Sequence, residues 1–362
     1  MKSGWAERLR RLLWIGRKVE TQKPMAGPGR LPVTHVILLD GTLATLEAGQ
    51  ESNVGRIYQL LRKVTQPGRL SLYYEAGVQW RLWSDTANVA MGRGINRQIR
   101  RAYGWLASHY RPGDRVYLIG YSRGAYAVRS LSGIIDQIGL LRAADATERN
   151  VMLAYRYYQT PETSAAEQAF SRQFCHPPFE VEMIGVFDTV KALGVRLPFL
   201  WMWTEPQHDF HNHALGKLVR RGYHALALDE TRTVFDPILW DTSGGDWQGR
   251  VEQVWFRGAH SDIGGQLGGF EAARPLANIP LLWMLEKAEG AGLPLPSGWR
   301  LDLPFNPDAP GVGTTRGWGK AFLFRSRRQV GRDASESIHG TALQTRRARY
   351  WLRRLPGLAN RV

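Results

Sequence analysis

A serine between two glycines is the strongest chemical signal in this sequence. Residues 120–124 read Gly-Tyr-Ser-Arg-Gly and fit the pattern Gly-x-Ser-x-Gly, with Ser122 at the centre. An apolar run, residues 115–120, leads directly into the motif, and an amphipathic run, residues 123–138, follows it. A strand, a sharp turn and a helix in this order form a nucleophile elbow, which holds a serine at strained backbone angles. The flanking glycines fit this geometry because side chains there would clash with the strand and the helix. The pattern predicts that Ser122 is a nucleophile.

A serine hydroxyl reacts only when a base removes its proton, and that base is normally a histidine oriented by a carboxylate. In folds with such an elbow, the chain order is serine, then acid, then histidine. Seven of the nine histidines follow Ser122. We favour His260 because it lies just beyond the apolar run 251–256, a predicted strand. Loops after the carboxyl ends of parallel strands carry active sites.

Chain order and position after a strand also select an acid. Asp188 ends the predicted strand 180–187 and lies between Ser122 and His260 in the chain. Three other acids in this part of the chain compete with it: Asp229, Asp236 and Asp262. Asp262 is two residues past His260, so it either orients the imidazole or braces its loop. We favour Asp188 and leave Asp262 open.

An ester hydrolase also needs donors for the oxyanion that forms during attack. One donor is expected from the backbone N–H of the residue after the nucleophile, and another from an early strand–helix loop. These rules select the N–H of Arg123 and that of Gly41 or Thr42. Asp40 either shapes the same loop or serves as an ordinary turn residue. This chemistry requires no metal and no organic cofactor.

The elements that must position these residues alternate between strands and helices. Strands are predicted over residues 33–39, 70–74, 115–120, 180–187 and 251–256. Helices are predicted over residues 53–64, 94–110, 123–138, 215–228 and 276–291. Such alternation predicts an α/β-hydrolase-like fold with a mainly parallel sheet and helices on both faces. Residues 143–178 are expected to be an insertion. The apolar residues 197–203 are expected to form a lid or acyl-pocket wall, or to pack over the sheet edge.

The charge lies at the two ends of the chain. The 362 residues carry a net charge of +16, with 40 Arg and 8 Lys. Residues 1–30 carry +6 and residues 316–362 carry +10, whereas residues 31–315 hold 28 basic and 28 acidic side chains. We therefore predict a hydrolase domain over 31–315 with a basic extension at each end. A Pro- and Gly-rich linker at 21–32 joins the N-terminal extension to the domain. A net positive charge confined to the ends argues against nucleic-acid binding as the main function.

Both ends mix apolar residues with arginine. Trp5, Leu9, Leu12 and Leu13 share one face of a predicted helix, a pattern typical of interfacial helices drawn to anionic lipid. Residues 346–355 repeat the theme, and a solvated Arg-rich end is the alternative. No apolar run is long enough to span a membrane, and the N-terminus lacks a secretory signal. We expect a cytoplasmic or peripheral membrane location, or delivery by contact-dependent secretion.

Three other signals are weaker. Cys175 is the only cysteine, which excludes an internal disulfide and multi-cysteine metal sites. Residues 36–43 look like the start of a haloacid-dehalogenase phosphatase, but Leu38 stands where its aspartate nucleophile would be. The His-rich tract at 208–213 matches no common zinc spacing, so we favour a polar loop over a metal site.

Seven motifs occur in an order that resembles a known family. They are LDGT at 39–42, SNVGR at 52–56, YYEAGV at 73–78, GYSRGAY at 120–126, FDTV at 187–190, HALALDE at 224–230 and GAHSDIGG at 258–265. The resemblance is to the broad α/β-hydrolase family that includes the catalytic domain of type VI secretion phospholipase effectors. It extends from about Val33 to about Gly292, and more weakly to His339.

The resemblance implies a triad of Ser122, Asp188 and His260 and the hydrolysis of carboxylic esters, with phospholipids as substrates. The sequence departs from the family at Glu75-Ala76, where Asp-Pro is frequent, and the chain is short for the added membrane-docking domain of the larger effectors. Two alternatives stay open. One is a small-ester esterase of the same fold, and the other is a non-catalytic membrane or partner adaptor that uses the basic ends.

Overall fold

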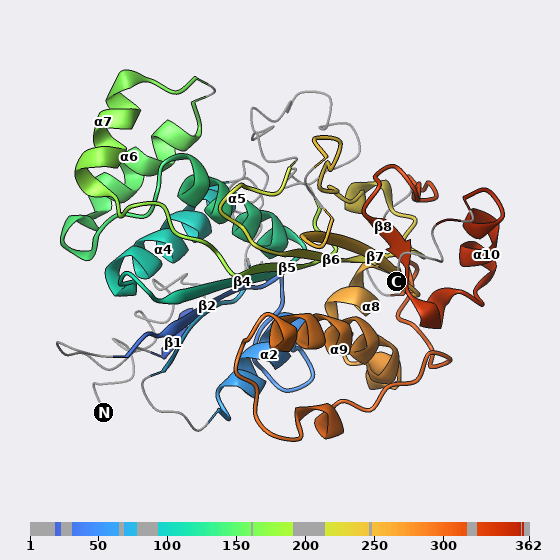
Figure 1. Cartoon of the computed structure of the whole chain (residues 1–362). Helices are drawn as coiled ribbons and strands as arrows, with labels where there is room; N and C mark the ends of the chain where they lie inside the picture. Colours follow the sequence, from blue (N-terminus) through green and yellow to red (C-terminus); the bar gives the residue numbers. More distant parts are fainter. Residues whose placement is uncertain are drawn as a thin grey trace, which may run out of the picture.

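An eight-stranded sheet runs through the part of the chain that the structure describes (Figure 1). The computed structural model describes residues 19–22, 31–64, 69–77, 93–160, 162–190, 214–245, 248–316, 324–355 and 357. The strands are β1 (Val19–Gln22), β2 (Thr34–Leu39), β3 (Leu70–Glu75), β4 (Arg115–Tyr121), β5 (Met183–Phe187), β6 (Gly222–Ala227), β7 (Val251–Phe256) and β8 (Glu336–Ile338). Their spatial order is β1-β3-β2-β4-β5-β6-β7-β8.

Every neighbouring pair in the sheet is parallel except β1 with β3. The central strands are buried on both faces: in β2, Val36 and Leu38 belong to one apolar cluster, whereas Ile37 and Leu39 belong to the other. Such two-sided burial is typical of parallel sheets covered by helices. The expected α/β-hydrolase-like fold with a mainly parallel sheet is confirmed.

Helices cover both faces of the sheet (Figure 1). They are α2 (Asn53–Leu61), α4 (Arg93–His109), α5 (Arg123–Gln137), α6 (Glu148–Tyr158), α7 (Ala165–Phe174), α8 (His260–Gly264), α9 (Arg274–Gly290) and α10 (Arg346–Leu352). α4 and α5 lie on one face, and α2 and α9 on the other. α6 and α7 form most of the expected insertion at 143–178, and they lie beyond α4 and α5.

One predicted element is wrong. Residues 215–228 were expected to form a helix, but residues 222–227 form strand β6 in the middle of the sheet. All six residues of β6 are buried, so both of its faces are covered and the strand shows no alternation of polar and apolar residues. A short, fully buried strand cannot be told from a buried helix by periodicity alone.

Both ends of the chain contribute strands to the sheet. β1 pairs with β3, so Thr21 and Gln22, expected in a linker, belong to a strand instead. β8 pairs with β7, so part of the expected C-terminal extension closes the other edge of the sheet. The domain boundaries remain a prediction, but the described parts of both extensions are continuous with the sheet.

Several predicted features lie outside the described residues. They are the amphipathic helix around Trp5–Leu13, the remainder of the linker at 23–30, the apolar segment 197–203 and the His-rich tract 208–213. Among the helices in the described ranges, none combines the length and apolar character that a membrane crossing requires.

Candidate active site

The carboxyl ends of β4, β5 and β7 lie along one side of the sheet and bring together the residues that the sequence singled out. Ser122 directly follows β4, Asp188 follows β5, and His260 begins α8 after β7. The Nε2 atom of His260 lies 2.9 Å from Ser122 Oγ, and its Nδ1 atom lies 2.5 Å from Asp188 Oδ2. The side chains thus form a continuous hydrogen-bonded relay at the carboxyl edge of the sheet. Ser122 is only 6% exposed, so little water reaches its hydroxyl.

Backbone strain is concentrated at this edge. Among the described residues, three non-glycine residues have positive φ: Leu43 at 64°, Ser122 at 57° and Asp188 at 44°. Two of them belong to the relay, and Leu43 lies in the loop after β2 where an oxyanion donor was expected. Strained backbone of this kind costs about 1–3 kcal/mol per residue and persists where the surroundings enforce it.

The elbow depends on a close approach that only glycine permits. A Cβ atom on Gly124 would lie 2.1 Å from the carbonyl oxygen of Leu39, and one on Gly120 would lie 2.5 Å from the carbonyl oxygen of Gly124. α5 therefore begins in contact with the end of β2. The clash that was expected to require flanking glycines is present at both positions.

The imidazole of His260 is held from several sides. The ring of Phe235 stacks on it at 4.6 Å, and the ring of Tyr121 lies at 4.9 Å. The backbone N–H of His260 donates to Oε2 of buried Glu230 at 3.1 Å. Arg232 donates two hydrogen bonds to the same carboxylate. Glu230 ends the motif at 224–230, and its place in the sequence predicts no role; in the structure it anchors the His260 backbone.

Asp188 is fully buried, and its carboxylate is saturated with donors. Oδ1 accepts the N–H of Ala227 at 3.0 Å and Nη1 of Arg328 at 2.5 Å. Oδ2 accepts Nη2 of Arg328 at 2.9 Å in addition to the imidazole. Burial alone would raise the pKa of Asp188, but the Arg328 guanidinium and the hydrogen bonds from His260 and Arg328 hold it far below its ordinary value. The carboxylate is therefore ionised.

Asp188 contacts the imidazole, whereas the acids that competed with it in the sequence do not. Asp262 accepts the N–H groups of Ala259 and Val312 at 2.8 and 2.6 Å, so it braces the loop that carries His260. Asp229 accepts the N–H of Gly258 at 2.8 Å. Within the described residues, no hydrogen bond joins Asp229, Asp236 or Asp262 to the imidazole.

His224, another histidine after Ser122, has a structural role. Its Nε2 accepts the N–H of Thr189 at 3.1 Å, which leaves the proton on Nδ1, 3.3 Å from Gln253 Oε1. Burial, followed by the charge of Arg129, lowers the pKa of His224 to about 3. The ring stays neutral and supports the backbone next to Asp188.

This histidine makes the fold sensitive to acid. In the unfolded chain a histidine takes up a proton near pH 6.5, whereas folded His224 does so only near pH 3, so stability is lost as the pH falls through this window. At pH 4.5 the loss from this group is about 2–3 kcal/mol. We expect His224→Gln, which keeps an acceptor for Thr189, to lose less stability between pH 7 and 4.5 than the wild type. Denaturant unfolding at both pH values measures this; an equal loss in the two proteins would refute it.

The loop after β2 lies against the nucleophile. A Cβ atom on Gly41 would lie 3.3 Å from Cβ of Ser122, and Gln266 donates to the carbonyl of Thr42 at 2.9 Å. The N–H of Gly41 donates to Asp40 Oδ1 at 2.7 Å. Of the two N–H groups in this loop that were considered as oxyanion donors, that of Gly41 is therefore already engaged.

Asp40 fixes this loop. Its carboxylate accepts hydrogen bonds from Ser52 Oγ at 2.6 and 2.8 Å and from the Tyr74 hydroxyl at 2.8 Å. Ser52 also caps α2, so Asp40 ties the loop to a helix and to β3. Burial raises the pKa of Asp40 to about 6, against the hydrogen bonds, which lower it.

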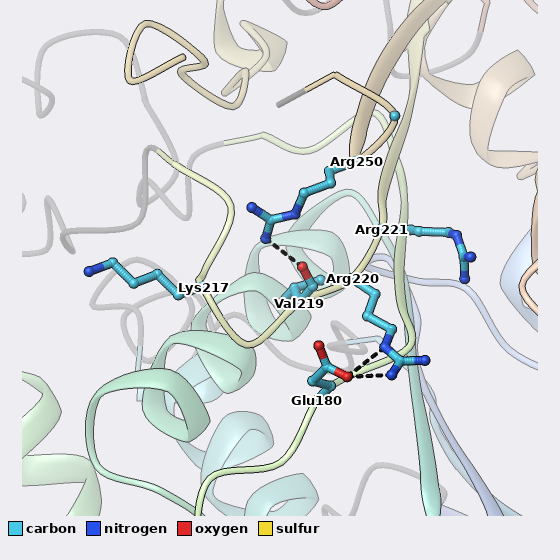
Figure 2. A pocket seen from close by; sticks show the side chains of 7 residues that line it. Glu180, Lys217, Val219, Arg220, Arg221 and Arg250 are labelled. Atoms are coloured by element: carbon cyan, nitrogen blue, oxygen red, sulfur yellow. Dashed lines mark hydrogen bonds and ion pairs between the residues drawn. The ribbon is translucent and has the colours of Figure 1, made fainter. Parts of the chain in front are cut away.

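A basic pocket lies at the amino ends of the strands, on the side of the sheet opposite the relay. Figure 2 shows Lys217, Arg220, Arg221 and Arg250 around it, near the amino ends of β6 and β7. Arg220 pairs with Glu180, and Arg250 donates to the carbonyl of Val219 at 2.7 Å. This pocket is separate from the relay, which lies at the carboxyl edge. In the described ranges no group of three or more His, Cys, Asp or Glu residues is placed to hold a metal ion.

The comparison with protein families explains why these motifs occur in order. Residues 34–287 match the family described as "T6SS, Phospholipase effector Tle1-like, catalytic domain". The chain belongs to this family. The match covers β2 through most of α9 and includes Ser122, Asp188 and His260, whereas Arg328 lies beyond it.

A curated protein also matches part of this chain, at low sequence identity. The uncharacterized protein YEL023C of Saccharomyces cerevisiae is 26% identical over 228 residues, which is 56% of this chain and 32% of that protein. The chain thus spans about a third of the length of the curated relative that it matches.

Solved structures match this chain at still lower sequence identity. An uncharacterized protein from Pseudomonas aeruginosa aligns with a TM-score of 0.45 and 18% identity, over 76% of this chain and 49% of that one. The Tle1 effector bound to the VgrG spike aligns with a TM-score of 0.35 and 19% identity, over 67% and 52%. Thermogutta terrifontis esterase 2 phosphonylated by cyclosarin aligns with a TM-score of 0.42 and 15% identity, over 77% and 90%.

Proposed function

We propose that this chain is a serine hydrolase that cleaves carboxylic ester bonds of phospholipids. Ser122 is the nucleophile, His260 is the general base and acid, and Asp188 orients the imidazole. The observation that carries the proposal is the relay of hydrogen bonds, 2.9 Å from Ser122 Oγ to His260 Nε2 and 2.5 Å from His260 Nδ1 to Asp188 Oδ2.

In the first half of the reaction, Ser122 Oγ attacks the ester carbonyl while His260 Nε2 takes the hydroxyl proton. Asp188 holds the Nδ1–H tautomer, so Nε2 is the free base. The carbonyl oxygen becomes an oxyanion in the tetrahedral intermediate. When this intermediate collapses, the C–O bond to the alcohol breaks, and His260 gives the proton to the leaving alcohol.

Water then completes the cycle. His260 takes a proton from the water as the oxygen attacks the acyl-enzyme carbonyl, and a second tetrahedral intermediate forms. Its collapse breaks the bond to Ser122 Oγ, which regains the proton from His260. The products are a free fatty acid and the alcohol portion of the lipid.

The oxyanion is stabilised by backbone N–H groups on both sides of the nucleophile. Arg123 begins α5 directly after Ser122, so its N–H lies at the positive end of the helix dipole. Of Gly41 and Thr42, we assign the second donor to Thr42, because the N–H of Gly41 donates to Asp40. Removing one such donor typically costs about 10²–10³ in kcat.

Three observations support a lipid substrate. The family is named for phospholipase effectors. Leu43, whose backbone has a positive φ and whose side chain is 47% exposed, presents an apolar group on the loop after β2. The apolar segment 197–203 follows Asp188 closely in the chain, as a lid or an acyl-pocket wall would.

The basic ends suit an anionic membrane surface. On α10 and just after it, Tyr350 and Leu355 are each 38% exposed, and the guanidinium of Arg354 lies 3.9 Å from the centre of the Tyr350 ring. Arginine beside exposed apolar groups fits peripheral binding to anionic lipid. The family name also supports delivery by type VI secretion, with action at a membrane after transfer.

Active-site labelling tests the hydrolase function. A fluorophosphonate probe should label the wild type at Ser122 and should not label Ser122→Ala, because the probe traps a serine that a base has activated. An unlabelled wild type, or equal labelling of the variant, would remove the hydrolase proposal and favour the adaptor.

Vesicle assays then decide the substrate. We expect fatty-acid release from phosphatidylglycerol vesicles, and slower release from phosphatidylcholine vesicles in low salt because the basic ends favour anionic lipid. Hydrolysis of p-nitrophenyl butyrate without release from either vesicle would favour the small-ester esterase. Equal rates on the two lipids at all salt concentrations would contradict the role of the basic ends.

A further inference from the structure

Arg328 is a buried arginine that reaches the relay from the C-terminal part of the chain. It is 4% exposed and lies 140 residues after Asp188. The segment that carries it is fixed to the loop after β6: the N–H of Ser326 donates to the carbonyl of Thr231 at 2.8 Å, and the N–H of Thr233 donates to the carbonyl of Phe324 at 3.2 Å. Val330 then enters the apolar cluster around β8. The segment is therefore held in place on both sides of Arg328.

The guanidinium grips both carboxylate oxygens of Asp188. Nη1 lies 2.5 Å from Oδ1, and Nη2 lies 2.9 Å from Oδ2. Nη1 also donates to the carbonyl of Ala227 at 3.0 Å, and Nη2 donates to the carbonyl of Phe235. A bidentate pair of this kind fixes the plane of the carboxylate as well as its distance. The same Oδ2 accepts the imidazole proton, so Arg328 determines where that acceptor lies.

The pair also sets the charge around the imidazole. An isolated buried carboxylate strongly favours an adjacent imidazolium, because the two opposite charges attract in a medium of low dielectric constant. Arg328 already offsets the charge of Asp188, so protonated His260 gains less from it. Two other titratable groups interact with the carboxylate, and both are neutral: the His224 ring and the Tyr121 hydroxyl. Glu230, which accepts the backbone N–H of His260, is paired with Arg232.

We propose that Arg328 is a positioning residue of the relay, which fixes the Asp188 carboxylate against His260 and keeps the imidazole neutral, and so able to act as a base, at lower pH. This inference rests on the proposed hydrolase function. It goes beyond it by assigning a part of the site to a segment outside the family match and outside the predicted hydrolase domain at 31–315.

A purely structural role is the competing explanation, since Arg328 also ties the C-terminal segment to the sheet. The two roles differ in what they change. Loss of a tether lowers stability and the folded fraction, and it leaves the ionisation of the imidazole unchanged. Loss of a positioning residue moves the pH at which the imidazole becomes protonated in the protein that remains folded.

The test compares Arg328→Gln and Arg328→Lys with wild type in the full chain. In Arg328→Gln, we expect the midpoint of the acidic limb of kcat/KM for p-nitrophenyl butyrate to rise by about one pH unit. The plateau should fall roughly ten- to a hundredfold, because the carboxylate loses its bidentate anchor. Arg328→Lys keeps the charge and loses the fork, so its midpoint should stay near that of wild type while its plateau falls.

Two further measurements separate the explanations. Arg250→Gln is the matched control, because Arg250 also donates to backbone carbonyls, at the opposite edge of the sheet. We expect a lower melting temperature and an unchanged pH profile. Proton NMR of the downfield His260 Nδ1–H resonance follows imidazole ionisation without turnover, and it should show the same upward shift in Arg328→Gln.

The outcomes are distinct. An unchanged midpoint in Arg328→Gln, by both rate and NMR, would overturn the proposal, as would a plateau in Arg328→Lys equal to that of wild type. If Arg328→Gln does not fold, the Lys variant alone decides through its plateau. An inactive wild type whose NMR titration still shifts in Arg328→Gln would refute the hydrolase function and leave the positioning of the Asp188–His260 pair intact.

Discussion

Replacing Ser122 or His260 by alanine should each reduce kcat by about 10⁶-fold, and the double replacement should reduce it no further. Without Ser122 there is no nucleophile, and without His260 nothing takes its proton, so each change disables the same step. In other hydrolases with this relay, single losses equal the combined loss, and a residual acceleration of about 10³–10⁴ over water comes from substrate binding and the oxyanion donors. Single-turnover rates on p-nitrophenyl butyrate for the four proteins measure this.

A second histidine provides the control. His339 is partly buried and stacks on the Phe256 ring at 4.6 Å, and it takes no part in the relay. His339→Ala should lower the melting temperature and leave kcat within a fewfold of wild type. If the losses in the Ser122 and His260 variants multiplied in the double variant, the two residues would act independently, and the relay would not be the catalytic unit.

Gly124→Ala should destabilise the fold by about 3 kcal/mol, because it overpacks the elbow. The added methyl group would lie 2.1 Å from the carbonyl oxygen of Leu39 and 2.6 Å from that of Asp40. Both are backbone atoms, so no side chain can turn aside to make room. The end of β2 and the start of α5 would have to separate, which would also move Ser122. Urea unfolding gives the free energy, and fluorophosphonate labelling reports the state of the nucleophile.

The matched control is a glycine in a helix with free space around it. Gly290 ends α9, and a Cβ atom there would have no neighbour within 4 Å. Gly290→Ala should change the free energy of unfolding by no more than about 1 kcal/mol, in the stabilising direction. Equal stability of the two variants would show that α5 is not pressed against β2.

Local signals in the sequence predicted most of the sheet. The strand that ends at Tyr121, the turn at Ser122 and the helix that follows were predicted to within a residue or two, because each carries its own periodicity and the glycines mark the turn. The edge strands β1 and β8 were missed. They have four and three residues, and short segments of this kind become strands only when a neighbour supplies the other half of each hydrogen bond.

Strand β6 shows the limit of periodicity. Its residues, Gly-Tyr-His-Ala-Leu-Ala, contain good helix formers and no alternation, and they were expected in a helix. The sheet overrides this preference because β5 and β7 pair with both edges of β6 and all six of its residues are buried. Tertiary contacts of this kind outweigh the small helix propensities of alanine and leucine.

The sequence by itself determined the nucleophile candidate and the order of its partners. An elbow is a property of a few consecutive residues, so Ser122 could be recognised from its neighbours, and chain order then favoured Asp188 and His260. Only the tertiary structure shows that Asp188 rather than Asp262 contacts the imidazole, because this 2.5 Å contact joins residues 72 positions apart. It also brought Arg328 to the carboxylate from a segment whose positive charge had seemed relevant only to membranes. Spacing along the chain carries no information about such contacts, because the sheet brings together strand ends that lie far apart in the sequence.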